Sequence, residues 1–322
     1  MVTFNCSNTV NKMLQQIRNF LLRQIFLLPV FRIPLERTYE RAKDKYSSDL
    51  PILYSDDSTC IKALEQEGVF ITSLDALEIP STPQLLLAAN NLLPQLSVTS
   101  PGNKKEYFVQ ATRKQILNYP NIFLWGLEER LINIAERYIG LPVFYQGSFL
   151  RRDLANGMQT KSRLWHRDHE DRRMLKIFVY LNDVNEYGGA FQYIPQDLSK
   201  LSSRILKYKH STIRDEVMQS VASTSHWKSC LGSVGTVIFA DTGSIFHRGS
   251  VPIMSERFSI IFSYTSRYPK NPHYCKSLFS KNELLTLAKN LSQRERESIL
   301  WQWTPTDILL PKGENARKTL QS

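Results

Sequence analysis

Residues 164–184 read LWHRDHEDRRMLKIFVYLNDV, and the second half of this stretch predicts a β-strand. The run from Leu175 is short, rich in β-branched and aromatic residues, and closed by Asn and Asp, which favour turns. Comparable runs follow the same rule: PVFYQGSFL at 142–150, AFQYIP at 190–195, GTVIFAD at 235–241 and RFSIIFSY at 257–264. Short strands at this spacing predict an antiparallel barrel or jelly roll.

Helical patterns lie on both sides of this β-rich region. Residues 82–97 and 121–140 have helical periodicity, and Gly140 suits a helix end. After the strands, two helical segments each open with a capping box, formed by Ser280 with Glu283 and by Ser292 with Glu295. Strands in one block with helices before and after it predict an α+β fold.

The chain divides into three regions. They are an N-terminal amphipathic helix with a connector (1–56), the main domain (57–268) and a C-terminal helical extension (269–322). The apolar stretch at 13–31 is interrupted by Arg18 and Arg23, which argues against a membrane-spanning helix or a signal peptide. We expect an amphipathic helix that ends near Pro29 and packs on the body, with peripheral membrane contact as the alternative. Residues 32–56 are charged and rich in turn formers, which predicts a connector.

Composition limits the class of protein. The 322 residues are 42% hydrophobic, enough to bury a large core. Four scattered cysteines without a C-x-x-C motif indicate neither a disulfide framework nor a thiolate zinc site, so a cytoplasmic location is expected. The formal charge of +11 fits nucleic acid, a membrane surface or acidic substrates. Nucleic acid is disfavoured, because no zinc-finger spacing, RNA-binding signature or long Lys/Arg block is present.

Two adjacent His-x-Asp triplets, 166–168 and 169–171, raise the question of a metal site. One such triplet is weak evidence, so a third ligand from a distant strand is needed. His247 is well placed, since it follows the strand at 235–241 and a Thr-Gly turn. Two histidines and one carboxylate leave three positions of an octahedral ion open, as in non-haem Fe(II) oxygenases and unlike closed structural zinc. Spacing alone does not choose between the triplets.

Ten residues after His247 lies Arg257, on a strand where Ser259 shares its face. An Arg with a Ser two residues further on can hold a carboxylate by charge-assisted bonding. The pair could therefore seat the remote carboxylate of 2-oxoglutarate, while an ordinary ion pair between Arg257 and a nearby acid is the alternative.

At this point the chain resembles the phytanoyl-CoA dioxygenase-like (PhyH) family of Fe(II)/2-oxoglutarate-dependent oxygenases, which have a double-stranded β-helix (jelly-roll, cupin-like) core. The resemblance covers roughly residues 60–268 and is densest from 164, through WHRDHEDRRMLKIFVYLNDV, GGAFQYIP, GTVIFADTGSIFHRGS and ERFSIIFSY. It implies Fe(II), 2-oxoglutarate and O2 as cofactors and co-substrates. The implied residues are His166, Asp168 and His247 as catalytic metal ligands, and Arg257, helped by Ser259, as the 2-oxoglutarate site.

The resemblance also bears on the choice of triplet and on the reaction. Family members commonly have a tryptophan before the first ligand, as Trp165 here, and often a proline where this chain has His169. This favours His166 with Asp168 over His169 with Asp171. Related halogenases replace the carboxylate ligand with Gly or Ala, so Asp168 favours hydroxylation or a related oxidation.

Substrate identity is open. Many relatives continue the strand at 190–195 with Gly-Ser-His, whereas this chain has QDLSK, so we expect a reshaped loop after a turn at 196–197. The resemblance implies oxidation of an unactivated C–H bond in a small-molecule, acyl or carrier-bound substrate. Basic residues gather at 151–176 and 200–209, which fits either a solvated face or an anionic substrate. A non-catalytic cupin-like binding protein and a nucleic-acid demethylase with the same cofactors are the alternatives.

Two smaller features complete the predictions. Lys176, Phe178 and Tyr180 alternate on one strand face, and either line the pocket or simply alternate. Gly188-Gly189 predicts a hairpin turn without a phosphate-binding role.

Overall fold

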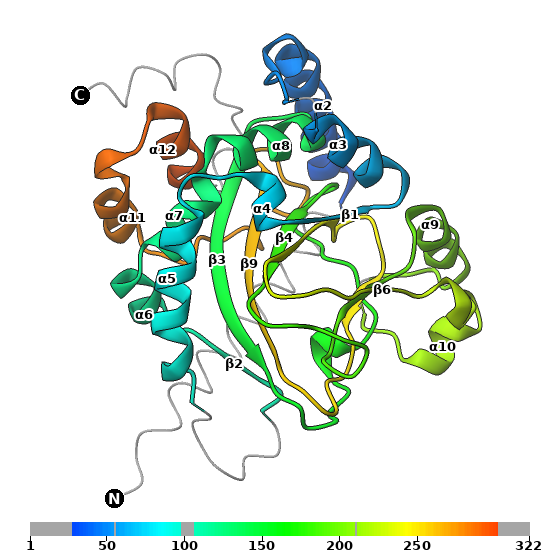
Figure 1. Cartoon of the computed structure of the whole chain (residues 1–322). Helices are drawn as coiled ribbons and strands as arrows, with labels where there is room; N and C mark the ends of the chain where they lie inside the picture. Colours follow the sequence, from blue (N-terminus) through cyan, green and yellow to red (C-terminus); the bar gives the residue numbers. More distant parts are fainter. Residues whose placement is uncertain (1–27, 55, 98–105, 210, 302–322) are drawn as a thin grey trace, which may run out of the picture.

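The structure is a computed structural model that describes residues 28–54, 56–97, 106–209 and 211–301. Two antiparallel sheets form its centre, and helices cover the outer face of the larger one (Figure 1). The strands are β1 (Val69–Ser73), β2 (Phe108–Gln110), β3 (Val143–Asp153), β4 (Leu175–Tyr180), β5 (Phe191–Tyr193), β6 (Lys228–Cys230), β7 (Thr236–Asp241), β8 (His247–Gly249) and β9 (Arg257–Ser266). The helices are α2 (Pro29–Tyr46), α3 (Asp57–Gln66), α4 (Leu74–Leu77), α5 (Thr82–Leu92), α6 (Arg113–Asn118), α7 (Asn121–Leu124), α8 (Glu129–Ile139), α9 (Gln196–Ile205), α10 (Asp215–Gln219), α11 (Lys281–Leu287) and α12 (Gln293–Leu300).

The larger sheet has six strands in the order β1-β7-β4-β9-β3-β2, and every neighbouring pair is antiparallel. The smaller sheet has the order β6-β5-β8, and an isolated bridge between His166 and His247 adds the start of the 166–171 segment beside β8. Two facing antiparallel sheets with strands that alternate between them form the double-stranded β-helix. The predicted α+β fold is confirmed.

Alternation along β4 places its side chains in two of the three apolar cores that the described residues form. Ile177 and Val179 belong to the core between the larger sheet and the helices. Phe178 and Tyr180 belong to the core between the two sheets, together with Phe191 of β5. Because successive side chains of a strand point to opposite faces, one strand supplies both cores.

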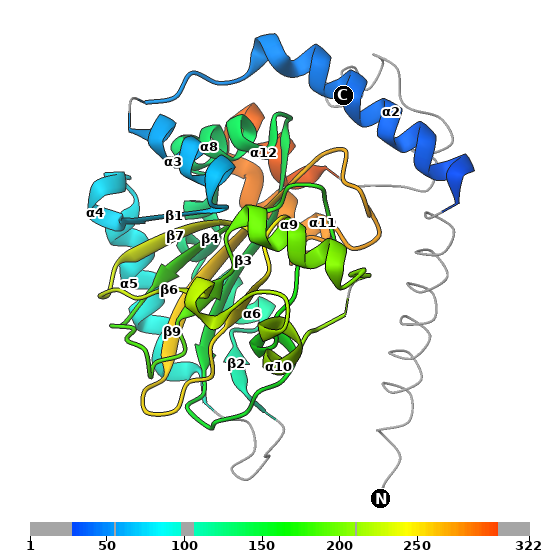
Figure 2. The same ribbon diagram turned by 90° about the vertical axis from the view of Figure 1, so that its right-hand side faces the viewer.

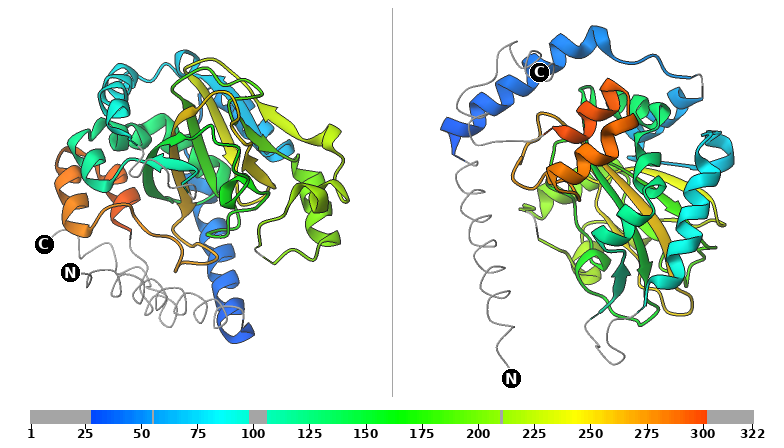
Figure 3. Two further views of the ribbon diagram at one scale, coloured as in Figure 1. Left: turned by 90° about the horizontal axis from the view of Figure 1, so that it is seen from below. Right: turned by 90° about the vertical axis from the view of Figure 1, so that its left-hand side faces the viewer.

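Helices pack on the outer face of the larger sheet. Seen from below, α11 and α12 lie on the opposite side of the molecule from α9 and α10 (Figure 3). Both predicted capping boxes are present, at Ser280 and at Ser292. Gly140, with a φ of 80°, ends α8 in the left-handed conformation that glycine adopts readily.

The prediction that residues 32–56 form a connector is wrong in part. Residues 29–46 form helix α2, which begins at Pro29 and runs along one end of the molecule (Figure 2). Proline is favoured in the first helical turn because its missing N–H has no partner there. The charged residues of α2 lie mostly on its exposed side, and Tyr39 is its one buried residue. Residues 13–27 of the predicted amphipathic helix lie outside the described residues.

Two loop predictions are also wrong. Gly188-Gly189 does not close a hairpin, since β5 pairs with β6 and β8, so the turn carries the chain from the larger sheet to the smaller one. The turn expected at 196–197 is instead the first turn of helix α9. Among the described helices, none is both long enough and apolar enough to span a bilayer. Cys60, Cys230 and Cys275 are buried free thiols, as expected without a disulfide framework.

Candidate metal centre

Backbone pairing brings the two predicted ligand histidines together. The N–H of His166 donates to the carbonyl of His247 at 3.1 Å, and the N–H of His247 donates to the carbonyl of His166 at 2.9 Å. Their ring centroids are 4.3 Å apart. Since this pairing fixes both main chains, the distance between the imidazoles does not depend on loop conformation.

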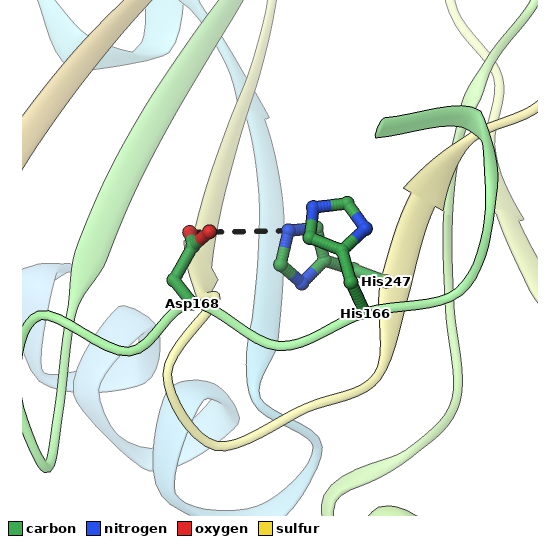
Figure 4. Close-up of side chains that lie close together, drawn as sticks. All are labelled: His166, Asp168 and His247. Carbon is green, nitrogen blue, oxygen red and sulfur yellow. Dashed lines mark ion pairs between the residues drawn. The ribbon is translucent and has the colours of Figure 1, made fainter. Parts of the chain in front are cut away.

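Asp168 completes the cluster. Its main-chain N–H donates to the carbonyl of Thr242 at 2.9 Å, which ties the 166–168 segment to the turn before His247. One ligand atom from each of His166, Asp168 and His247 lies within 4.8 Å of the others, and the side chains are turned toward one another (Figure 4). The predicted third ligand therefore does meet the first triplet.

The turn before His247 is held by Asp241, which sequence reasoning did not single out. This fully buried carboxylate accepts hydrogen bonds from the N–H of Met174 at 3.0 Å, the N–H of Gly243 at 3.1 Å and the hydroxyl of Tyr138 at 2.7 Å. The only signal in the sequence is an acid at the end of a buried strand.

Hydrogen bonds select the tautomer of both imidazoles. Nδ1 of His166 lies 2.8 Å from the carbonyl of Leu164, and Nδ1 of His247 lies 3.3 Å from the carbonyl of Ile245. A carbonyl can only accept, so Nδ1 carries the proton and Nε2 keeps its lone pair. Burial lowers the pKa of both histidines, so both are neutral at neutral pH, the form that binds metal.

Asp168 is charged, and its Oδ2 lies near both Lys176 and His247. Oδ2 lies 3.9 Å from Nε2 of His247 and 2.6 Å from the ammonium of Lys176. Burial opposes ionisation, but Lys176 and then His247 outweigh it and hold the pKa of Asp168 well below its usual range. Apart from this ion pair with Lys176, the buried oxygen accepts no hydrogen bond from the residues that the structure describes. Two imidazole lone pairs and such a carboxylate oxygen fit a divalent cation.

The second triplet has a structural task. Asp171 is buried, and its Oδ2 accepts from the N–H and the hydroxyl of Ser266 at 2.8 and 2.6 Å. Its Oδ1 accepts from the N–H of Arg172 at 2.7 Å and from the N–H of Lys270 at 3.1 Å. The carbonyl of His169 accepts from Asn271 Nδ2 at 2.5 Å. The 169–171 segment therefore anchors the chain that follows β9.

Arg257 and Ser259 share one buried face of β9, as expected. The guanidinium of Arg257 pairs with Asp153 at 2.9 Å and donates to the carbonyl of Gly189. Burial opposes the charge of Asp153, but Arg257 and Arg151 outweigh it and lower its pKa. Nε of Arg257 and the hydroxyl of Ser259 have no hydrogen-bond partner among the described residues. The predicted pair thus keeps unsatisfied donors in the interior.

The alternating face of β4 has a mixed role. Phe178 and Tyr180 fill the core between the sheets, whereas Lys176 pairs with Asp168. Sequence reasoning placed Lys176 on this face but gave it no ion pair, because nothing in the spacing links it to Asp168.

A cavity of about 210 Å³ opens onto the candidate ligands. Residues 166–170 form one wall, and the other lining residues are Tyr208, Ser211, Thr212 and Tyr274. These four come from segments without a recognisable motif, and sequence reasoning missed them. The described lining residues include no aliphatic side chain.

The chain is similar in part to several solved structures. No protein-family model and no curated protein matches the chain. A structure of EctD from S. alaskensis with 2-oxoglutarate and 5-hydroxyectoine has a TM-score of 0.48 at 19% identity, over 66% of this chain and 76% of that one. The non-heme alpha ketoglutarate dependent carbocyclase SnoK from nogalamycin biosynthesis has a TM-score of 0.48 at 17% identity, over 67% and 85%. HygX from Streptomyces hygroscopicus, with nickel and 2-oxoglutarate bound, has a TM-score of 0.44 at 13% identity, over 67% and 88%. At these values the activity of this chain is inferred from its own side chains.

Proposed function

We propose that this chain is an Fe(II)/2-oxoglutarate-dependent dioxygenase that oxidises an unactivated C–H bond of a small molecule. The observation that supports this most directly is the convergence of His166, Asp168 and His247 within 4.8 Å, with both Nδ1 atoms directed to main-chain carbonyls. When bound, a ferrous ion would supply the oxidising chemistry, with O2 and 2-oxoglutarate at the three positions that the protein leaves open.

The protein would hold the co-substrate through Arg257 and Ser259. Both face the interior, and each keeps a donor that no described residue satisfies. Asp153 and Gly189 fix the rest of the guanidinium, which leaves Nε as the donor for the remote carboxylate. A pre-oriented donor loses little entropy when its ligand binds.

The reaction is hydroxylation or a related oxidation in place of halogenation. Asp168 supplies a carboxylate at the position where a halogenase needs room for chloride, and it is charged. The buried surroundings of His247 would also keep bulk water from the site.

The substrate is a small polar molecule with hydroxyl or amino groups. The cavity beside the ligands presents Tyr208, Ser211, Thr212, Tyr274 and the carboxylate of Glu170. The described lining has no aliphatic side chain, so a long alkyl chain would find only the ring faces of Tyr208 and Tyr274 to bury against. A free polar substrate is therefore favoured over a fatty acyl chain.

The first test measures Fe(II)-dependent conversion of 2-oxoglutarate to succinate during a screen of polyols, amino sugars and amino acids. We expect one class to stimulate turnover in the wild type and none to do so in Asp168→Ala. Absence of succinate in every case, with metal bound, would instead indicate a binding protein. Retention on DNA or RNA at physiological salt, with stimulated turnover, would favour the demethylase alternative.

A second test separates the two parts of the site. Arg257→Lys keeps a charge for Asp153 but loses the planar fork, so we expect 2-oxoglutarate to bind about 10-fold more weakly while Mn(II) affinity stays within about 3-fold. Calorimetric titration of each ligand measures both. Equal loss of the two affinities would contradict the role of Arg257.

A further inference from the structure

The ammonium of Lys176 lies beside the oxygen of Asp168 that faces the other proposed metal ligands. Its ammonium is 2.6 Å from Oδ2 of Asp168, and the same oxygen lies 3.9 Å from Nε2 of His247. The side chains of Lys176 and Asp168 are 20% and 13% exposed. A resident cation therefore lies beside the carboxylate that a metal ion would share.

The charges of this cluster balance without a metal. The charge of Asp168 is offset by that of Lys176, and the further charged groups that act on Lys176, Glu170 and Arg151, carry opposite signs. A divalent cation would add two positive charges next to an ammonium, in surroundings that exclude most water. Such an excess is costly unless an anion enters as well. A dianion carries the charge that restores the balance.

We propose that Lys176 couples metal binding to the binding of a dianionic co-substrate, so that the site holds a divalent ion tightly only when the dianion is present. This rests on the proposed function, because it takes His166, Asp168 and His247 as metal ligands. Lys176 acts through Asp168 and through the charge of the site, and is a positioning residue. Thermodynamic linkage requires the metal to strengthen dianion binding by the same factor by which the dianion strengthens metal binding.

The central variant is Lys176→Met, which keeps an unbranched apolar stem and removes the charge. We expect Mn(II) affinity without 2-oxoglutarate to rise about 10-fold, and the enhancement of that affinity by 2-oxoglutarate to fall about 10-fold, within the usual range of coupling between sites. Some enhancement remains, because 2-oxoglutarate also chelates the ion.

Two variants serve as controls. Lys176→Arg keeps the charge and should keep the coupling. Lys228 pairs with Glu67 at 2.7 Å on the surface, with 49% of its side chain exposed. Lys228→Met therefore removes an ion pair of similar length away from the site and should change neither quantity.

The experiment titrates full-length protein with Mn(II), without oxygen, and follows the free ion by electron paramagnetic resonance with and without saturating 2-oxoglutarate. Titration of 2-oxoglutarate with and without Mn(II) checks the reciprocal factor. Equal coupling in the wild type and in Lys176→Met would overturn the role of Lys176. Should Lys176→Met fail to fold, Lys176→Gln takes its place, since it can still donate to Asp168 without a charge.

The two proposals fail in different ways. If wild-type protein binds no Mn(II), or binds it equally well in His247→Ala, the metal centre is wrong and the proposed function falls. If binding depends on His247 but the coupling factor is the same with and without the Lys176 charge, only the coupling fails.

Discussion

Two His-x-Asp triplets, residues 166–168 and 169–171, follow one another in the chain and carry the same chemical groups, but they do different work. In the first, the imidazole of His166 and the carboxylate of Asp168 face His247 across a short gap. In the second, the carboxylate of Asp171 is surrounded by donors from Ser266, Arg172 and Lys270. Asp171 has no capacity left for an ion, whereas Oδ2 of Asp168 is held only by its ion pair with Lys176 among the described residues.

The difference comes from what each triplet pairs with. The first lies beside β8, the strand that begins with His247, so main-chain pairing brings the proposed third ligand to it. The second lies beside the end of β9 and the segment after it, which supply hydrogen-bond donors and no ligand. The two His-x-Asp motifs differ in their contacts because different segments lie beside them. Those segments are about 80 to 100 residues away in the chain.

Among the variants of the two triplets, Asp168→Asn should have the largest effect, on metal affinity. The amide keeps the size of the side chain and can still accept from Lys176, but it removes the negative charge that a divalent ion needs. We expect Mn(II) affinity to fall at least about 100-fold, because loss of a direct ligand exceeds the 10- to 100-fold typical of groups behind the ligands. Titration of Mn(II) into folded protein measures it. An affinity within a few fold of the wild type would remove Asp168 from the metal site.

The matching change in the other triplet, Asp171→Asn, should affect stability instead. Asn offers one acceptor oxygen where the carboxylate offers two. The buried donors that bond to the second carboxylate oxygen therefore lose their acceptor. We expect the free energy of unfolding to fall by about 2–4 kcal/mol, since each unsatisfied buried donor costs about 1–3 kcal/mol. Urea unfolding measures it, and Mn(II) affinity of the folded variant should stay within about 3-fold of the wild type.

Asp183→Asn provides the control for that change. Its Oδ1 accepts one exposed hydrogen bond from the N–H of Val234 at 2.8 Å, so we expect a loss of no more than about 1 kcal/mol. Similar losses for Asp171→Asn and Asp183→Asn would mean that Asp171 does not anchor the segment after β9.

The parts of this comparison that follow local rules could be predicted from the sequence. The two-residue period of β4 placed Phe178 and Tyr180 on the face opposite Ile177. The strand and turn before His247 predicted that this residue lies near the first triplet, as it does. The four donors of Asp171 could not be foreseen, because three of them come from residues 266–270 and no spacing encodes that contact.

Other features had a misleading local signal. The charged run within α2 reads as a connector, but Glu, Lys and Arg are also good helix formers, and a helix that buries only Tyr39 needs no apolar stripe. The pairing of Arg257 with Asp153 joins residues 104 apart, so the sequence predicted a cation on β9 without its partner.

The smallest effect should come from His169→Ala, and it sharpens the comparison most cleanly. The contact of His169 that anchors the 169–171 segment uses its main-chain carbonyl, which accepts from Asn271 at 2.5 Å and is unchanged in the variant. We expect the free energy of unfolding to change by less than about 1 kcal/mol and Mn(II) affinity by less than about 3-fold. Because the ring lines the cavity, the loss should appear in the KM of a stimulating substrate instead. His166→Ala, measured beside it, should abolish tight Mn(II) binding. If the two variants exchange these outcomes, the second triplet is the metal site, and the pairing of His166 with His247 has only a structural role.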